Sequence, residues 1–181
     1  MPVAARPYHG PPSGWVCGQR WSYDRGSFQC DGGELSLSEL VPFWDLQSVH
    51  FVDAKVHVTP GVALAGVSQL ALTATVIDGR DLVSSFPDTR SLWLVRTSMD
   101  GAVLRDLLQL SSLLVARMPV PAASDLAAVE SLRNVDLNFA TCGEDGCPDE
   151  VAERLRALRP DIVVRVNGRG LTAGRAPGEA D

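Results

Sequence analysis

The chain has 181 residues, of which 45% are hydrophobic and 21% charged, and its formal net charge is −6. This length allows one substantial core or an array of about seven short units. One lysine, Lys55, and arginines scattered singly along the chain supply the positive charge. A phosphate backbone needs a basic stripe, and none is present, so we expect no nucleic-acid partner.

The sequence also shows no recognisable secretory signal or membrane-spanning segment. Proline and glycine interrupt residues 1–14, where a secretory signal would need an apolar run of about 7 to 15 residues. A membrane-spanning helix would need about 18 consecutive apolar residues, and the chain contains no such run. We therefore expect a soluble, cytoplasmic protein that does not contact membranes.

The N-terminal region precedes the regular part of the chain. Residues 1–14 carry little core material and are predicted to be disordered. Residues 15–27 begin with WVCGQRWSYDRG, which mixes β-forming residues with turn residues. This composition predicts a short strand or hairpin that caps the first unit of an array, because the first apolar layer would otherwise face water.

From residue 28 onward, a pair of apolar residues separated by one residue recurs along the chain. The first members of the pairs lie 21, 21, 22, 21, 22 and 27 residues apart. Such a period is typical of repeat proteins. In a strand, the two apolar members point into the core and the residues beside them point out. The pairs are Phe28/Cys30, Val49/Phe51, Leu70/Leu72, Leu92/Leu94, Leu113/Val115, Val135/Leu137 and Ile162/Val164.

Helical spacing follows several of these predicted strands. Apolar residues lie four apart in segments 81–86 and 102–109, and segment 149–158 has one apolar face opposite Glu and Arg. This arrangement predicts amphipathic helices packed against a sheet. A unit of about 21 residues is too short for an ordinary βαβ crossover.

The segments LQSVHFVDAKV, VSQLALTATVI, TRSLWLVRTSM, LSSLLVARMPV and LRNVDLNFATC resemble leucine-rich repeats of the short, bacterial type. The resemblance covers residues 28–167 and implies an α/β leucine-rich repeat solenoid. A parallel sheet of about seven strands would line its concave side, with short helices or irregular segments on the convex side. The family usually has Asn or Cys five residues after the first strand residue. That ladder is nearly absent here, where the positions hold Ala54, Thr75, Thr97, Met118, Ala140 and Asn167.

The four cysteines form two pairs near the two ends of the array. Cys17 and Cys30 are close enough in sequence to touch, and we expect two buried free thiols in preference to a disulfide. Cys142 occupies an apolar turn position and Cys147 lies in the insertion CGEDGCPDE beside acidic residues. For this pair an incidental thiol is favoured over a redox-dependent disulfide. A metal site is the least favoured reading, because no His lies nearby. Residues 168–181 carry almost no core material and are predicted to be a disordered tail.

Enzyme motifs are missing from the sequence. It lacks a nucleophile elbow, a phosphate-binding loop, a zinc-protease motif and a dinucleotide fingerprint. His50 and Asp136 point outward from predicted strands four positions apart, at roughly 19 Å for standard strand spacing, so they cannot form a catalytic dyad. We expect a protein that is not an enzyme and holds no cofactor or metal.

The outward-facing strand residues carry the functional hypothesis. The first predicted column is His50, Ala71, Trp93, Leu114, Asp136 and Val163, and the next is Val52, Thr73, Val95, Ala116, Asn138 and Arg165. An uncovered apolar centre with a polar rim indicates a binding surface. The predicted partner-binding residues are His50, Trp93, Val95, Leu114, Asn134, Asp136, Asn138 and Arg165.

These observations favour a protein–protein interaction module that binds its partner on the concave face. One alternative is a structural or accessory repeat region of a larger system. Another is an inhibitor or immunity protein that occludes an enzyme, since an acidic curved surface suits a basic target. A third alternative is that Trp93 only shields the sheet or packs against an end segment.

Overall fold

The computed structural model describes residues 15–17, 19–20, 26–43 and 45–170. The predictions of disorder for residues 1–14 and 171–181 lie outside the described residues. Within the described part of the chain, none of the helices combines the length and the apolar character needed to cross a bilayer.

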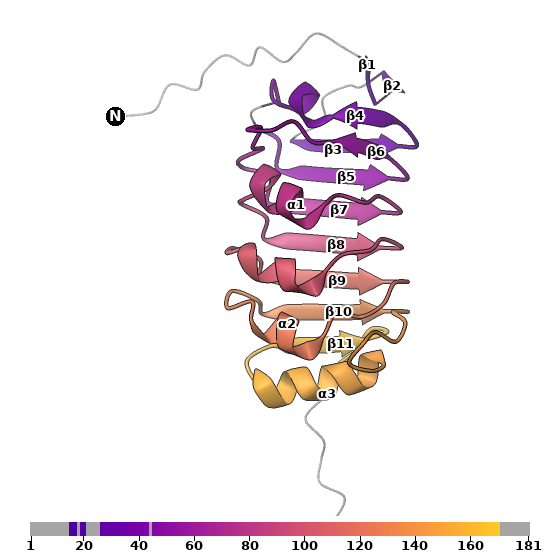
Figure 1. Cartoon of the computed structure of the whole chain (residues 1–181), viewed down its shortest axis with the longest axis vertical. Helices are drawn as coiled ribbons and strands as arrows, with labels where there is room; N and C mark the ends of the chain where they lie inside the picture. The colour runs from indigo at the N-terminus through magenta and orange to yellow at the C-terminus, as the bar shows by residue number, and fades with distance from the viewer. Residues whose placement is uncertain (1–14, 18, 21–25, 44, 171–181) are drawn as a thin grey trace, which may run out of the picture.

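A sheet of eight strands dominates the structure (Figure 1). Seven strands are parallel and stand side by side in chain order, and the last strand runs antiparallel to its neighbour. The α/β class and the seven parallel strands are therefore as predicted. The strands are β3 (Ser27–Asp31), β5 (Ser48–Val52), β7 (Gln69–Thr73), β8 (Ser91–Val95), β9 (Ser112–Ala116), β10 (Asn134–Asn138), β11 (Val163–Val166) and β12 (Arg169–Gly170).

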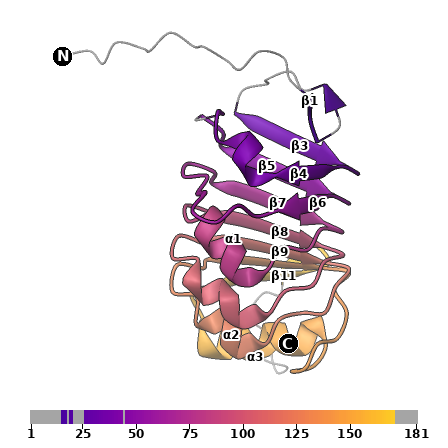
Figure 2. The same ribbon diagram turned by 45° about the horizontal axis from the view of Figure 1, so that its top comes forward.

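Short helical segments in the connections cover one face of this sheet (Figures 1 and 2). They are η1 (Leu37–Leu40), α1 (Gly79–Ser85), η2 (Gly101–Asp106), α2 (Ala123–Ala127) and α3 (Pro148–Leu158). The expected helices at 81–86, 102–109 and 149–158 correspond to α1, the 3-10 helix η2, and α3. The other described strands are the antiparallel hairpin β1 (Trp15–Val16) and β2 (Gln19–Arg20), which lies within the segment 15–27, and the parallel pair β4 (Glu34–Ser36) and β6 (Lys55–His57).

The core lies between the sheet and the helical layer. Alternation along each strand sends two residues into this core, and on β8 these are Leu92 and Leu94, both 0% exposed. Trp93 between them is 51% exposed on the opposite face. The helical layer contributes buried leucines that include Leu82 and Leu104. The core is therefore one continuous apolar layer, as the alternation predicts.

A residue with a left-handed backbone follows each of six strands of the large sheet, β3, β5, β7, β8, β9 and β10. These residues are Gly32, Asp53, Ala74, Arg96, Arg117 and Phe139, with φ between 48° and 64°. This conformation is unfavourable for residues with a Cβ. The hydrogen bonds explain why it recurs: the N–H of Ala74 donates to the carbonyl of Val95 at 2.8 Å, and that of Asp53 donates to Thr73 at 2.8 Å. The turns after β3, β5, β7 and β8 are thus each hydrogen-bonded to the end of the next strand.

Two threonines continue this fastening inside the turns. The backbone N–H of Ala54 donates to Thr75 Oγ1 at 3.1 Å, and Thr97 Oγ1 donates to the carbonyl of Thr75 at 2.5 Å. Both hydroxyls are buried, at 1% and 8% exposure of their residues. The two threonines therefore supply side-chain hydrogen bonds at positions where a ladder is otherwise missing.

The register of β11 corrects one sequence-based prediction. Val135 and Leu137 pair with Val164 and Val166, not with Ile162 and Val164. The last interval is therefore 29 residues, from 135 to 164. The alignment was wrong because Ile162 is itself buried, at 4% exposure, and mimics a strand position from the preceding turn. The outward neighbour of Asp136 is consequently Arg165, and Val163 lies in a different row.

The sheet ends in a hairpin that the prediction of a disordered tail did not include. Asn167 and Gly168 have φ values of 50° and 73° and connect β11 to the antiparallel β12. A two-residue Asn-Gly turn with both φ values positive is the favoured hairpin connection. Asn167 Oδ1 also accepts a hydrogen bond of 2.6 Å from the N–H of Phe139. Its amide oxygen thus replaces the strand carbonyl that the earlier turns use.

Both cysteine pairs form disulfides, Cys17–Cys30 and Cys142–Cys147. The expectation of free thiols was therefore wrong for both pairs. The hairpin β1–β2 brings Cys17 to β3, with 5.7 Å between the Cα atoms of Cys17 and Cys30. Cys142 is exposed and not a core residue, because the six-residue loop turns it out of the apolar layer.

Candidate binding face

The sheet face opposite the helices is called the open face here, and it presents three rows of side chains. Backbone register fixes the rows, since paired residues on parallel strands point the same way. The middle row is Gln29, His50, Ala71, Trp93, Leu114, Asp136 and Arg165. The described helices all lie on the other side of the sheet (Figures 1 and 2).

The centre of the open face is apolar. Trp93 on β8 stands opposite Leu114 on β9, and Val95 lies two residues farther along β8 on the same face. Trp93 is exposed, whereas Leu114 and Val95 are half-buried. The three predicted central residues are therefore neighbours, with the indole as their most accessible part.

Beside Trp93 the open face has a depression of about 110 Å³. Ala71 forms part of its floor, because its methyl group stands between the larger side chains of His50 and Trp93 in the middle row. An engineered apolar cavity of about 150 Å³ binds benzene, so this volume corresponds to one aliphatic side chain. The depression is lined by Ser48, His50, Gln69, Leu70, Ala71, Ser91 and Trp93.

The polar residues predicted on strands β10 and β11 also come together. Arg165 Nη1 lies 3.6 Å from Asp136 Oδ1 across the two strands. Asn134 and Asn138 flank Asp136 on the same face of β10. The corrected register of β11 places Arg165 directly opposite Asp136, so the ion pair follows from strand pairing.

His50 stands at the other end of the apolar centre. Its Nε2 lies 3.1 Å from Thr73 Oγ1 on the next strand. On the neighbouring edge strand β3, Gln29 Nε2 donates to both carboxylate oxygens of Asp31, at 3.1 and 2.9 Å. Sequence reasoning did not select Ser48, Gln69 or Ser91, which line the depression. The signal that could have found them was the single small residue, Ala71, between two rings in the middle row.

The chain was compared with models of known protein families and with curated proteins. Neither comparison gives a match.

A charged cluster lies away from the open face, on strands β4 and β6. Glu34 Oε1 accepts a hydrogen bond from Lys55 Nζ at 3.1 Å and contacts His57 Nε2. The hydrogen bond with His57, followed by that with Lys55, lowers the pKa of Glu34. All three side chains are exposed, so this cluster contributes little to stability.

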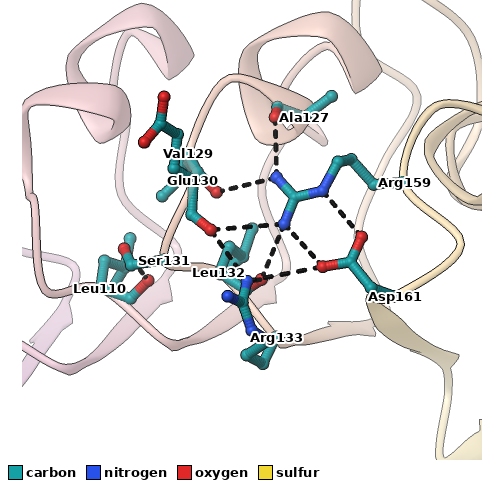
Figure 3. Close-up of polar contacts among 9 residues, drawn as sticks. All are labelled: Leu110, Ala127, Val129, Glu130, Ser131, Leu132, Arg133, Arg159 and Asp161. Atoms are coloured by element: carbon teal, nitrogen blue, oxygen red, sulfur yellow. Dashed lines mark hydrogen bonds and ion pairs between the residues drawn. The ribbon is translucent and has the colours of Figure 1, made fainter.

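A second polar cluster centres on Arg159, just after α3 (Figure 3). Its guanidinium contacts both carboxylate oxygens of Asp161 at 2.8 Å, and the Arg159 side chain is 20% exposed. This hydrogen-bonded partner lowers the pKa of Asp161 to about 2. The same guanidinium donates, at 3.1 to 3.4 Å, to the carbonyls of Ala127, Val129, Glu130 and Leu132. Arg159 therefore binds the end of α3 to α2 and the turn after it.

No group of three or more His, Cys, Asp or Glu side chains within the described ranges is arranged to hold a metal ion.

Proposed function

We propose that this chain is a non-enzymatic protein-interaction module with a leucine-rich repeat solenoid fold, and that its partner binds on the open face. Three features support the fold proposal: the interval of 21 or 22 residues, strands in chain order, and the left-handed residue after each strand. Stacked short units with one continuous core are typical of solenoids. In this proposal the open face is the concave side.

The observation that carries the functional proposal is Trp93 beside the unfilled depression over Ala71. Trp93 is 51% exposed, although the residues before and after it on β8 are fully buried. Tryptophan is strongly enriched among the residues that dominate interface energies, usually next to pockets that exclude water. The occupant is a protein partner that inserts one aliphatic side chain between His50 and Trp93.

The edge of the depression specifies a second property of this partner. Ser48, Gln69 and Ser91 line it with groups that donate and accept hydrogen bonds. The partner's backbone beside its aliphatic anchor would pair with these groups. The Asp136–Arg165 pair lies two and three strands from Trp93 and provides charges of both signs that fix orientation.

Affinity capture with three variants tests this proposal. Trp93→Ala removes the anchor surface, and Ala71→Phe fills the depression while keeping the face apolar. Leu108→Ala is the matched control, since Leu108 is 80% exposed in the segment after η2 and not on the open face. A captured protein is accepted as a partner only if both the native protein and the Leu108→Ala variant retain it.

For such a partner, purified and titrated directly, Trp93→Ala and Ala71→Phe should each weaken binding about 30-fold, as expected for a hot spot of about 2 kcal/mol. Thermal unfolding of each variant establishes that it is folded. If folded Trp93→Ala and Ala71→Phe proteins bind every partner as the native protein does, the open face is not the binding site.

A cytoplasmic location remains part of the proposal and is separately testable. Cytosolic thiols keep most disulfides reduced, whereas the structure contains two. Rapid acid quenching of cells followed by alkylation measures the state of each cysteine. Complete oxidation of the exposed Cys142–Cys147 pair in the quenched sample would argue for an oxidising compartment.

A further inference from the structure

The two disulfides differ in accessibility. Cys17 and Cys30 are buried, with exposures of 4% and 0%. Cys142 and Cys147 are both exposed. Reduction requires a thiolate to reach one sulfur directly, so accessibility controls the rate. An external thiol can therefore reach only the second pair while the protein stays folded.

The chain segments on both sides of Cys142 and Cys147 are anchored by contacts other than the disulfide. On one side, Thr141 is bonded through its N–H to Met118 and through its carbonyl to Val120, at 2.9 and 3.0 Å. On the other side, Cys147 precedes α3, whose Val151 and Leu155 are 0% exposed. Breaking the disulfide leaves these anchors in place, so the cysteines stay close enough to form it again.

Glycines shape the loop between the two cysteines. The N–H groups of Gly143 and Gly146 donate to each other's carbonyls at 2.9 and 3.4 Å. Gly146 has a φ of 122°, which a residue with a Cβ rarely adopts. A Cβ on Gly143 would clash with the carbonyl of Val120. Backbone hydrogen bonds and glycine conformations thus define this turn in addition to the disulfide, and the sulfurs of Cys142 and Cys147 point outward from it.

The charges around the exposed pair are mostly negative. Glu144 and Asp145 lie inside the loop, and Asp149 and Glu150 lie in the first turn of α3. Glu150 Oε2 accepts a hydrogen bond of 3.0 Å from the Cys147 N–H, which places this carboxylate next to the disulfide. Arg154 supplies the nearby positive charge by donating to the carbonyl of Asp145 at 2.8 Å. An anionic thiol is repelled by this surface, and a cationic one is attracted.

We propose that Cys142–Cys147 is a thiol–disulfide exchange site that takes electrons from cationic or neutral thiols, and that Cys17–Cys30 is a structural disulfide that does not exchange in the folded protein. An incoming thiolate attacks one sulfur, forms a mixed disulfide and releases the other cysteine as a thiolate, which takes a proton. A second thiol attacks the mixed disulfide and leaves as the oxidised reductant. Two thiols are thereby oxidised to one disulfide, and Cys142 and Cys147 are reduced.

The test uses the native chain and three monothiols of different charge: cysteamine, 2-mercaptoethanol and reduced glutathione. Samples are acid-quenched at intervals and alkylated, and peptide mass spectrometry then measures the labelled fraction of each cysteine. Rate constants are corrected for the thiolate fraction of each reagent. The double variant Glu144→Gln with Asp145→Asn is the matched charge control.

Cys142 and Cys147 should become labelled at least about 100-fold faster than Cys17 and Cys30, because the buried pair must first become exposed by unfolding. At low salt, cysteamine should react about tenfold faster than glutathione, and this ratio should shrink in about 1 M salt. The charge variant should show a smaller ratio than the native chain.

Three results would overturn the proposal. Equal labelling of both pairs would mean that reduction follows global unfolding. Equal corrected rates for the three thiols would refute the charge selection. Labelling of Cys142 and Cys147 before any thiol is added would mean that the pair is not oxidised in the folded protein. Binding through Trp93 does not enter these measurements, so their failure would leave the proposed function intact.

Discussion

Arg159 offers the strictest test of how the C-terminal end of the structure is held together. We expect Arg159→Ala to lower the free energy of unfolding by about 3 kcal/mol. A hydrogen bond to a charged group makes a net contribution of about 1.5–3 kcal/mol to stability, and the longest bonds of Arg159 contribute least. The contacts with four backbone carbonyls run from 3.1 to 3.4 Å, and the Asp161 side chain is 49% exposed, so neither the carbonyl contacts nor the ion pair gives its full value.

Arg159→Lys should recover less than half of this loss. A lysine ammonium cannot contact two carboxylate oxygens and several carbonyls at once, because its donors radiate from a single nitrogen. Arg105→Ala is the control, since Arg105 has a 63% exposed side chain and a single 3.8 Å contact to Asp106. Its effect should stay within about 0.5 kcal/mol.

Urea unfolding followed by far-UV circular dichroism measures these differences. With a slope of about 2 kcal/mol per molar urea, a loss of 3 kcal/mol moves the midpoint by about 1.5 M. Arg159→Ala with an unchanged midpoint, or Arg159→Lys equal to the native protein, would refute the reasoning.

Three further predictions follow from the fold. The Arg159 guanidinium lowers the pKa of Asp161 from its usual 3.8 to about 2, so the stabilising contribution of this carboxylate is present above about pH 4 and is lost as pH falls toward 2. Asp161→Asn should therefore weaken the fall of the free energy of unfolding on the acid side. An unchanged dependence on pH would contradict this. Ala74→Gly should stabilise the protein by about 0.5–1 kcal/mol, because glycine tolerates the φ of 49° at this position. Gly32→Ala should destabilise the protein by about 1 kcal/mol, because the φ there is 64°. Thermal unfolding that gives the opposite signs would exclude backbone strain as the cause. Leu94→Ala should cost about 2–5 kcal/mol in urea unfolding, whereas Trp93→Ala should cost about 1 kcal/mol or less, and similar losses would refute the assignment of the two residues to opposite faces.

Much of the fold was predictable because the repeat encodes it many times. The alternation at Leu92, Trp93 and Leu94 recurs on neighbouring strands, so an error at one position does not change the pattern. Strand β11 was misaligned because it ends the parallel array and only β10 precedes it at a comparable interval, and because Ile162 satisfies the same apolar rule as Val164. Periodicity records burial, and both residues are buried.

The cysteines and the depression show what periodicity leaves out. Whether two sulfurs meet depends on the three-dimensional path of the hairpin β1–β2 and of the loop before α3, and neither belongs to a repeat. The depression depends on a difference in size between neighbours, since Ala71 is small and His50 and Trp93 are large. A hydrophobicity pattern treats alanine and tryptophan alike, so it places Trp93 on the open face without showing the space beside it.

The left-handed turn after each strand also bears on how the length of this protein can change. The turns after β5, β7 and β8 carry the same backbone connection to the next strand. Duplicating one of these units of 21 or 22 residues should therefore lengthen the sheet by one strand spacing, about 4.8 Å, without new turn chemistry. After β11 the amide oxygen of Asn167 and the reversed strand β12 occupy the place of that connection. Added units are therefore compatible with the interior of the sheet and not with its β12 edge. The area of the open face can vary in steps of one strand while both ends stay the same.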